Sequence, residues 1–96
     1  ADENRSIMKL NRAISLCNKA NDLAKQKQFD AGLQASREAL KIAPDAPQVK
    51  ENTVIYMNNY AADCVQKQNL KQAESLMKEA LTIQTNGGVT NSSKLI

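Results

Sequence analysis

Two stretches of this chain decide how it folds: residues 29–42 read FDAGLQASREALKI, and residues 70–83 read LKQAESLMKEALTI. Both contain the triplet Glu-Ala-Leu with isoleucine two residues later, and an offset of 41 residues places one triplet on the other. Apolar residues recur in both at the three- and four-residue spacing of an amphipathic helix. The chain therefore carries an internal repeat, and the repeated unit includes a helix.

A second helical stripe precedes each stretch, over about residues 4–26 and 47–67. The phase of the apolar pattern is lost around residues 28–30 and 68–69, which predicts turns there. These patterns predict four helices paired as two antiparallel hairpins. We therefore expect an all-α fold in which the hairpins stack as a short right-handed solenoid.

Polar residues and helix breakers indicate where the helices begin and end. We expect Asp30 to cap the second helix, and Asp45 to cap the third with Gln48 as its capping-box partner. Pro44 ends the second helix, and Gly87 is placed to close the fourth in the left-handed conformation. The intervening turns are short, so consecutive helices should lie antiparallel.

The two hairpins resemble tetratricopeptide repeats, which pair large and small residues on a first helix and alanine with an apolar residue on a second, followed by proline. The first copy matches this pattern at Leu16, Ala20, Leu23, Phe29, Gly32, Ser36, Ala39 and Pro44. The second copy matches it at Met57, Tyr60, Ala61, Cys64, Leu70, Ala73, Met77 and Ala80. The small residues let the paired helices approach closely. Lys19 and Thr85 depart from the pattern, since an apolar residue and proline are usual there.

The repeat is longer than the family's usual length of ~34 residues by about seven, which is close to two helical turns. We interpret the excess as lengthening of the first helix of each hairpin, which places Met8 level with Val49. The chain then divides into an extension of the first helix, a first repeat, an extension of the third helix, a second repeat and a flexible tail, at residues 1–12, 13–46, 47–53, 54–87 and 88–96.

The composition argues against several classes of function. The 96 residues include no histidine, and Cys17 and Cys64 form neither a zinc cage nor a CxxC pair. In repeat register the two cysteines lie about 9 Å apart along the helix axis, so we expect no disulfide.

The acidic residues share no site, and we predict a non-enzymatic chain without metal or cofactor. The net charge of +3 is dispersed and aromatic residues make up only 3% of the chain, which argues against nucleic-acid binding. No apolar run approaches the ~20 residues that span a bilayer.

The resemblance implies a protein–protein interaction module whose first helices line a concave groove for a peptide or partner helix. The residues at its groove positions are Ile14, Cys17, Asn21, Ala24, Lys25, Ile55, Asn58, Asn59, Ala62 and Gln66. The short amides among them can hydrogen-bond the backbone of a bound peptide. Asn21 and Asn59 also fall where chaperone-docking members of the family place the two asparagines of a carboxylate clamp. Cys17 stands at that clamp's first lysine position, and its other basic residues belong to a third repeat.

Two alternatives to the groove follow from the same pattern. One is docking of a C-terminal carboxylate, as in co-chaperones. The other is a structural role in which the chain forms a homodimer through its last helix, near Leu76 and Ile83, because such arrays commonly need about three repeats. The expected partner is a protein or peptide, with no nucleic acid and no membrane. The sequence does not decide the compartment: the cytoplasm is favoured, and the periplasm or secretion is the alternative if Ala1 is a mature N-terminus.

Overall fold

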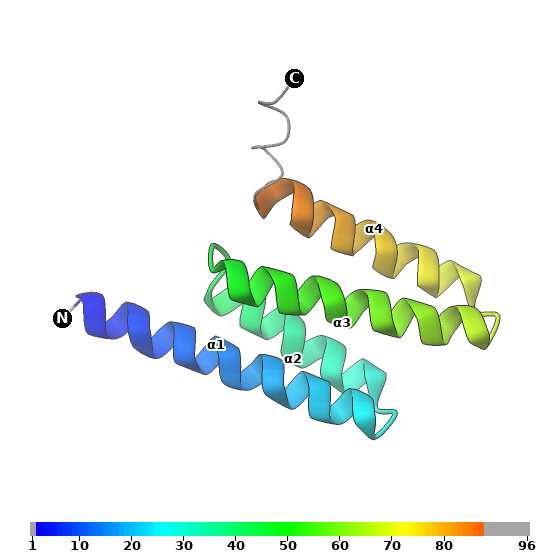
Figure 1. Cartoon of the computed structure of the whole chain (residues 1–96), viewed down its shortest axis with the longest axis horizontal. Coiled ribbons are helices and arrows are strands. Elements are labelled where there is room, and N and C mark those ends of the chain that lie inside the picture. Colours follow the sequence, from blue (N-terminus) through cyan, green and yellow to red (C-terminus); the bar gives the residue numbers. More distant parts are fainter. Residues whose placement is uncertain (1, 88–96) are drawn as a thin grey trace.

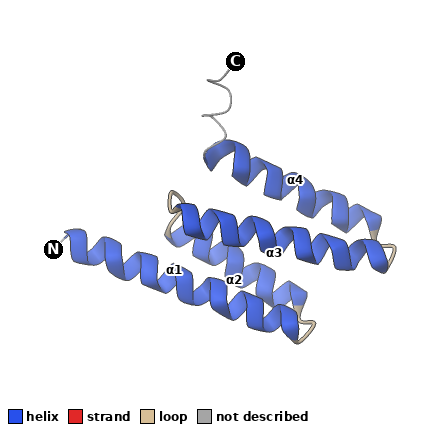
Figure 2. Cartoon of the chain, viewed as in Figure 1, coloured by secondary structure: helices blue, strands red, loops and turns tan. Residues whose placement is uncertain are grey.

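A computed structural model of the chain describes residues 2–87, with side chains described from Asn4 to Thr85. Over that range it contains four helices and no strand: α1 (Asp2–Lys25), α2 (Phe29–Ile42), α3 (Pro47–Gln66) and α4 (Leu70–Gly87). The predicted all-α fold of two hairpins is confirmed (Figure 2). Helices α1 and α3 run side by side in the same direction, with α2 behind them and α4 beyond α3 (Figure 1).

The two hairpin turns have the same backbone geometry and the same closing hydrogen bonds. Lys27 and Gln68, 41 residues apart, have φ angles of 66° and 63°. In each turn the amide of the next residue donates to the carbonyl five residues before that amide, at 2.8 Å. The amides of Lys27 and Gln68 themselves donate to the carbonyls three residues before them, at 2.9 and 3.0 Å. This is the Schellman ending of a helix. Gly87, expected to close α4 in the left-handed conformation, is instead the last residue of α4, and no glycine among the described residues has a positive φ.

The expected helix caps differ from those in the structure. Gln28 rather than Asp30 is the N-cap of α2, and Ala46 rather than Asp45 is the N-cap of α3; neither makes a side-chain capping bond. Ala46 is extended because the following residue is proline. Asp30 lies inside the first turn of α2, where its carboxylate accepts a hydrogen bond from the Tyr60 hydroxyl. Both acidic residues were placed correctly near helix starts but one or two positions from the cap.

Helix α3 is continuous from Pro47 through Gln66, and the level at which it meets α1 differs from the expectation. Val49 is fully buried in a cluster with Ala13 and Cys17. Met8, expected beside Val49, is 69% exposed, because the first turns of α1 project past the start of α3 (Figure 1). Cys17 and Cys64 are both buried and free, in agreement with the expected absence of a disulfide.

Two tyrosines fix α3 against the first hairpin. The Tyr56 hydroxyl donates to the carbonyl of Phe29 at 2.7 Å. It occupies space left by Gly32: a Cβ atom there would lie 2.0 Å from the Tyr56 oxygen and 3.0 Å from the carbonyl oxygen of Ala20. The Tyr60 ring stacks on Phe29 with centroids 4.9 Å apart. Glycine, a poor helix former, is therefore needed at position 32 because a tyrosine of the next repeat fills the space beside it.

One ion pair ties the second helices of the two hairpins together. The guanidinium of Arg37 donates to both carboxylate oxygens of Glu79, at 2.7 and 2.9 Å. This hydrogen bond to Glu79 raises the pKa of Arg37 above its ordinary value. Both side chains are partly exposed, so the pair orients α2 and α4 more than it stabilises the fold.

Candidate functional site

The solvent-facing side of α3 carries an uncharged stripe. Its residues recur at three- and four-residue spacing, so they share one face of the helix, opposite the buried tyrosines. All of them are exposed: Ile55, Asn58, Asn59, Ala62 and Gln66. An apolar side chain at one end and four small or amide side chains along the rest give a surface that can hydrogen-bond without charge.

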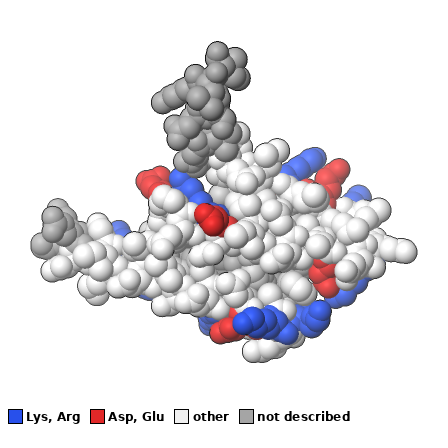
Figure 3. Space-filling model, in the orientation of Figure 1, with Lys and Arg blue, Asp and Glu red and all other residues white. Residues whose placement is uncertain are grey.

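Helix α1 adds residues to the same side of the molecule. Asn21 and Lys25 are exposed, and Ile14 and Ala24 are half-buried. Because α1 and α3 are parallel, residues of α1 face the same way as residues of α3 that lie 41 positions later. Charged side chains lie mainly around the rim of this face, and its middle is largely uncharged (Figure 3).

Cys17 is the one residue of the expected groove that the structure buries. It is 3% exposed and packs in the cluster that contains Val49 of α3. Burial raises the pKa of its thiol, and a hydrogen bond with the Asn52 side chain lowers it by less. The periodicity placed Cys17 on a groove-facing turn of α1, but that flank is covered by α3. A buried thiol therefore stands at the position where the carboxylate clamp has its first lysine.

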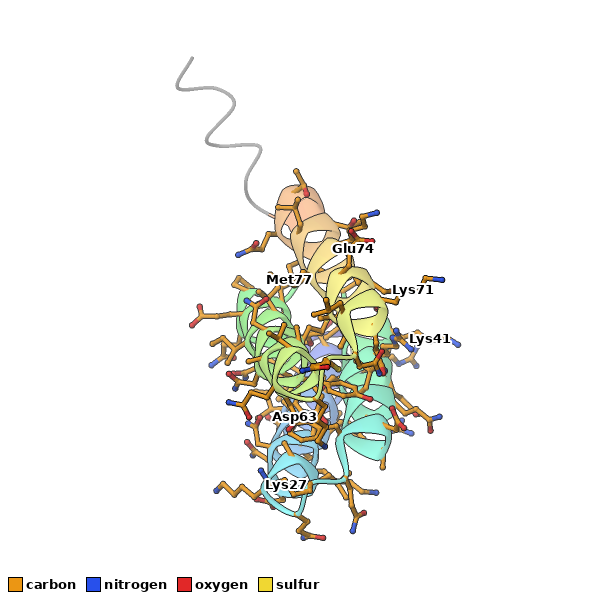
Figure 4. The ribbon with its side chains drawn as sticks, turned by 90° about the vertical axis from the view of Figure 1, so that its right-hand side faces the viewer. Lys27, Lys41, Asp63, Lys71, Glu74 and Met77 are labelled. Atoms are coloured by element: carbon orange, nitrogen blue, oxygen red, sulfur yellow. The ribbon has the colours of Figure 1, made fainter. Side chains whose placement is uncertain are left out.

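A polar cavity of about 380 Å³ lies at the turn end of the two hairpins, and the sequence pattern did not predict it. It is lined by Lys27, Phe29, Asp30, Tyr60, Asp63, Cys64, Lys67, Asn69 and Gln72. Lys27 and Asp63 are seen at this end in Figure 4. The polar groups pair with one another: Lys67 with Asp63 at 3.0 Å, and the Gln72 amide with the Tyr60 hydroxyl at 2.9 Å. The cavity is therefore a network that joins the two turns.

An apolar surface covers the outer side of the second hairpin, and we call it the end face. A hollow of about 360 Å³ is lined by Val65, Leu70, Ala73, Glu74, Met77, Lys78 and Leu81. Its large apolar side chains are 50–63% exposed. Figure 4 shows Met77 in the notch between α3 and α4.

The end face corrects the expected position of the uncovered surface of the last helix. Leu76 and Ile83, expected there, are only 3% and 9% exposed. They lie with Ala73 and Ala80 on the side of α4 that packs into the core. Helix α4 carries apolar residues on two of its faces. The sequence pattern alone did not show which face packs into the core and which face is exposed to solvent.

Among the described side chains, those of residues 4–85, no group of three or more His, Cys, Asp or Glu could hold a metal ion. No helix in the described part of the chain is both long and apolar enough to cross a membrane.

A comparison with family models matches residues 11–86 to the model described as tetratricopeptide repeat. Comparisons with curated proteins and with solved structures give no significant match. The matched segment includes most of both hairpins, both turns and all of the expected groove and end-face residues.

Proposed function

The chain belongs to the tetratricopeptide repeat family, and on that premise we propose that it binds a peptide or partner helix along the uncharged face of α1 and α3. Repeats of this family are generally non-enzymatic protein–protein interaction modules. The observation that carries the proposal is the stripe of exposed amide and small residues on α3, beside the exposed Asn21 of the parallel helix α1. Apart from Lys25 at one end, such a surface has hydrogen-bonding capacity without a fixed charge to be neutralised.

The amides give the surface its chemistry. Asn21, Asn59 and Gln66 each carry a carbonyl acceptor and an NH₂ donor, so each can bond both polar groups of a peptide backbone. Ile14 and Ile55 precede the amides on α1 and α3 and offer apolar contact at one end of the stripe. Such a surface recognises backbone first and selects side chains by size, and an extended ligand with alternating apolar side chains fits it best.

Charge selects among ligands at one end. Lys25 is the cation of the set, and an acidic residue at the corresponding end of the ligand would lie beside it. A terminal carboxylate alone is a poorer fit, because the buried Cys17 supplies no second cation. The ligand we expect is therefore an internal peptide segment with an acidic flank.

The test is to select a peptide ligand and then to measure how much its binding weakens in a groove variant. Short random peptides displayed on phage are selected on the folded chain, and the dissociation constants of the selected peptides are measured by calorimetry. The double variant Asn21→Ala/Asn59→Ala should weaken binding by about tenfold or more, since each amide supplies hydrogen bonds worth about 1 kcal/mol. Gln34→Ala, an exposed amide on α2 outside the groove, is the matched control. Equal affinity for the double variant and the control would refute the groove.

A further inference from the structure

We propose that the end face docks an amphipathic helix of a partner protein, in the position that α3 occupies on the first hairpin. The proposal concerns a surface separate from the uncharged groove, and its partner need not be the groove ligand. It rests on the internal repeat, since the chain itself shows what covers this surface when the next helix is present.

An offset of 41 residues superimposes the end face on the surface that α3 covers. The equivalent pairs are Ala24 and Val65, Phe29 and Leu70, Gly32 and Ala73, Ser36 and Met77, and Leu40 and Leu81. In the first hairpin Ala24, Phe29 and Leu40 pack against the core cluster that contains Tyr56 and Tyr60, Gly32 lies against the Tyr56 hydroxyl, and Ser36 is 1% exposed. In the second hairpin Ala73 is buried, but the other four equivalents are 50–63% exposed. Four of the five positions are thus more covered in the first hairpin than in the second, and α3 is the helix that packs against the first hairpin.

The opposite flank of the array is mainly polar. Arg12, Ser15 and Lys19 of α1 stand 41 residues before Thr53, Tyr56 and Tyr60, α3 residues that are buried. All three are exposed and polar, and Met8, which stands 41 residues before the buried Val49, is the exposed apolar residue of this set. The end face, in contrast, presents four exposed apolar side chains.

The polar flank also excludes one occupant, the α1 helix of a second copy added head to tail. That copy would bury Arg12 at the position where Thr53 is fully buried. Its Lys19 would take the position that Tyr60 has on the first hairpin, where the Tyr60 hydroxyl donates to Asp30. The residue equivalent to Asp30 in the second hairpin is Lys71, so the two lysines would lie side by side. Burying the Arg12 guanidinium and placing the ammonium groups of Lys19 and Lys71 side by side are both unfavourable. The occupant is therefore a helix of a different sequence.

Shape defines one position of that helix. In the first hairpin Gly32 leaves room for the Tyr56 ring, and the neighbouring Ser36 is small. In the second hairpin Ala73 and Met77 fill the same space. A tyrosine would not fit there, so the docked helix should carry a small residue at the position equivalent to Tyr56 and larger apolar residues a turn away on either side.

Charge defines a second position of the helix. Asp30, the acceptor for Tyr60, is replaced by Lys71 in the second hairpin, so a carboxylate on the docked helix suits that position. Arg37, which binds Glu79 of α4 at 2.7 Å, is replaced by Lys78, but its partner does not lie on α3, so this replacement does not constrain the docked helix. The partner is therefore an amphipathic helix with an apolar stripe and a carboxylate at the position equivalent to Tyr60, parallel to α3.

A synthetic helix tests this directly. The probe is the α3 sequence, residues 47–66, with Tyr56→Ala and Tyr60→Glu, closed by a staple between the positions of Ile55 and Asn59 on the face that α3 turns to solvent. Its helicity is verified by circular dichroism, and it is titrated into the full 96-residue chain. We expect saturable binding that Met77→Glu weakens by about tenfold or more, since the variant places a charge in an apolar contact.

Three controls isolate the surface. Met8→Glu changes another exposed methionine, on α1, and should leave the affinity unchanged. A probe with lysine instead of glutamate at the position of Tyr60 should bind several-fold more weakly, because it faces Lys71. Asn21→Ala/Asn59→Ala should have no effect, which separates this proposal from the groove.

Three outcomes would overturn the proposal. One is no binding by a probe that is demonstrably helical. Another is binding that Met77→Glu leaves intact, with Leu81→Lys as a second variant of the same face. The third is a dimer in sedimentation that Met77→Glu dissociates and Met8→Glu does not, which would assign the end face to a second copy of the chain.

Discussion

The two hairpins have nearly the same backbone and nearly opposite outer surfaces. Their turns have a left-handed residue at the same position and the same closing hydrogen bonds, and their second helices share Glu-Ala-Leu. Yet Ser36 is buried, while Met77, its equivalent, is exposed. The comparison teaches that a repeat specifies where helices lie, whereas the neighbouring repeat decides which of their faces become core.

The largest expected effect comes from exchanging the small residues at equivalent positions of the two hairpins. Gly32→Ala should lower the free energy of unfolding by about 2–3 kcal/mol, although alanine is the better helix former, because the new methyl group clashes with the Tyr56 hydroxyl and with the Ala20 carbonyl. Ala73→Gly should cost only about 1 kcal/mol, the ordinary helix-propensity difference. Urea denaturation followed by circular dichroism measures both.

A second variant makes this result specific to the contact. In a Tyr56→Phe background the clash with the hydroxyl is gone, and Gly32→Ala should cost less than in the wild type. If Gly32→Ala stabilised the wild-type chain as helix propensity alone predicts, α3 would not lie on the first hairpin as described, and the contrast between the hairpins would lose its basis.

The next effect concerns the hydroxyl that links α3 to both second helices. Tyr60→Phe removes the bonds to Asp30 and Gln72 and should lower the free energy of unfolding by about 1 kcal/mol at neutral pH. The residue equivalent to Tyr60 in the first hairpin is the exposed Lys19, and Lys19→Ala should change stability by less than about 0.5 kcal/mol. A comparable loss at both positions would contradict the proposed asymmetry of the two flanks.

The same tyrosine predicts an alkaline transition. Burial, followed by the hydrogen bond to Asp30, raises the pKa of Tyr60 from 10.0 to about 12, and burial likewise raises that of Tyr56 to about 12. The folded state therefore favours the neutral phenols, so their contribution is complete below pH 10 and is lost as the pH rises toward 12. Unfolding measured at about pH 8 and about pH 11 should show the loss, and Tyr60→Phe should reduce it. Equal pH dependence in the two proteins would show that Tyr60 is not buried.

Much of the fold followed from the sequence because it depends on local spacing. The 41-residue offset between Ala39 and Ala80 predicted two hairpins, and the loss of phase near residues 28–30 and 68–69 located both turns. Such signals lie within one helix or one turn. They do not depend on how the helices pack.

The details that differed depend on contacts between helices. Cys17 and Leu76 lie on apolar or small-residue stripes, but which side of each stripe is covered depends on how α3 packs, and periodicity within one helix does not report that. The space that Gly32 leaves for Tyr56 joins residues 24 positions apart. The polar cavity at the turn end likewise assembles from three helices and two turns. A candidate groove could be proposed from repeat position, but its buried member and the end face required the packed structure.

A smaller effect tests whether the two turns are as similar energetically as they are in geometry. Lys27→Gly and Gln68→Gly should each raise the free energy of unfolding by about 0.5–1 kcal/mol, because glycine adopts positive φ without a clash. Lys19→Gly, in the interior of α1, is the control and should cost about 1 kcal/mol. Thermal and urea unfolding give the three values, and a clear gain at one turn with a loss at the other would break the equivalence that the end-face comparison assumes.

The smallest expected effect is the most informative about the end face. Met77→Ser places in the second hairpin the residue that is buried at the equivalent position of the first hairpin. It should change the free energy of unfolding by less than about 0.5 kcal/mol, because a half-exposed methionine contributes little buried area to the isolated chain. Urea unfolding at two protein concentrations measures it. A loss of more than about 1 kcal/mol that grows with concentration would mean that copies of the chain already cover Met77. A negligible loss at both concentrations leaves the end face open in the isolated chain, as docking of a partner helix requires.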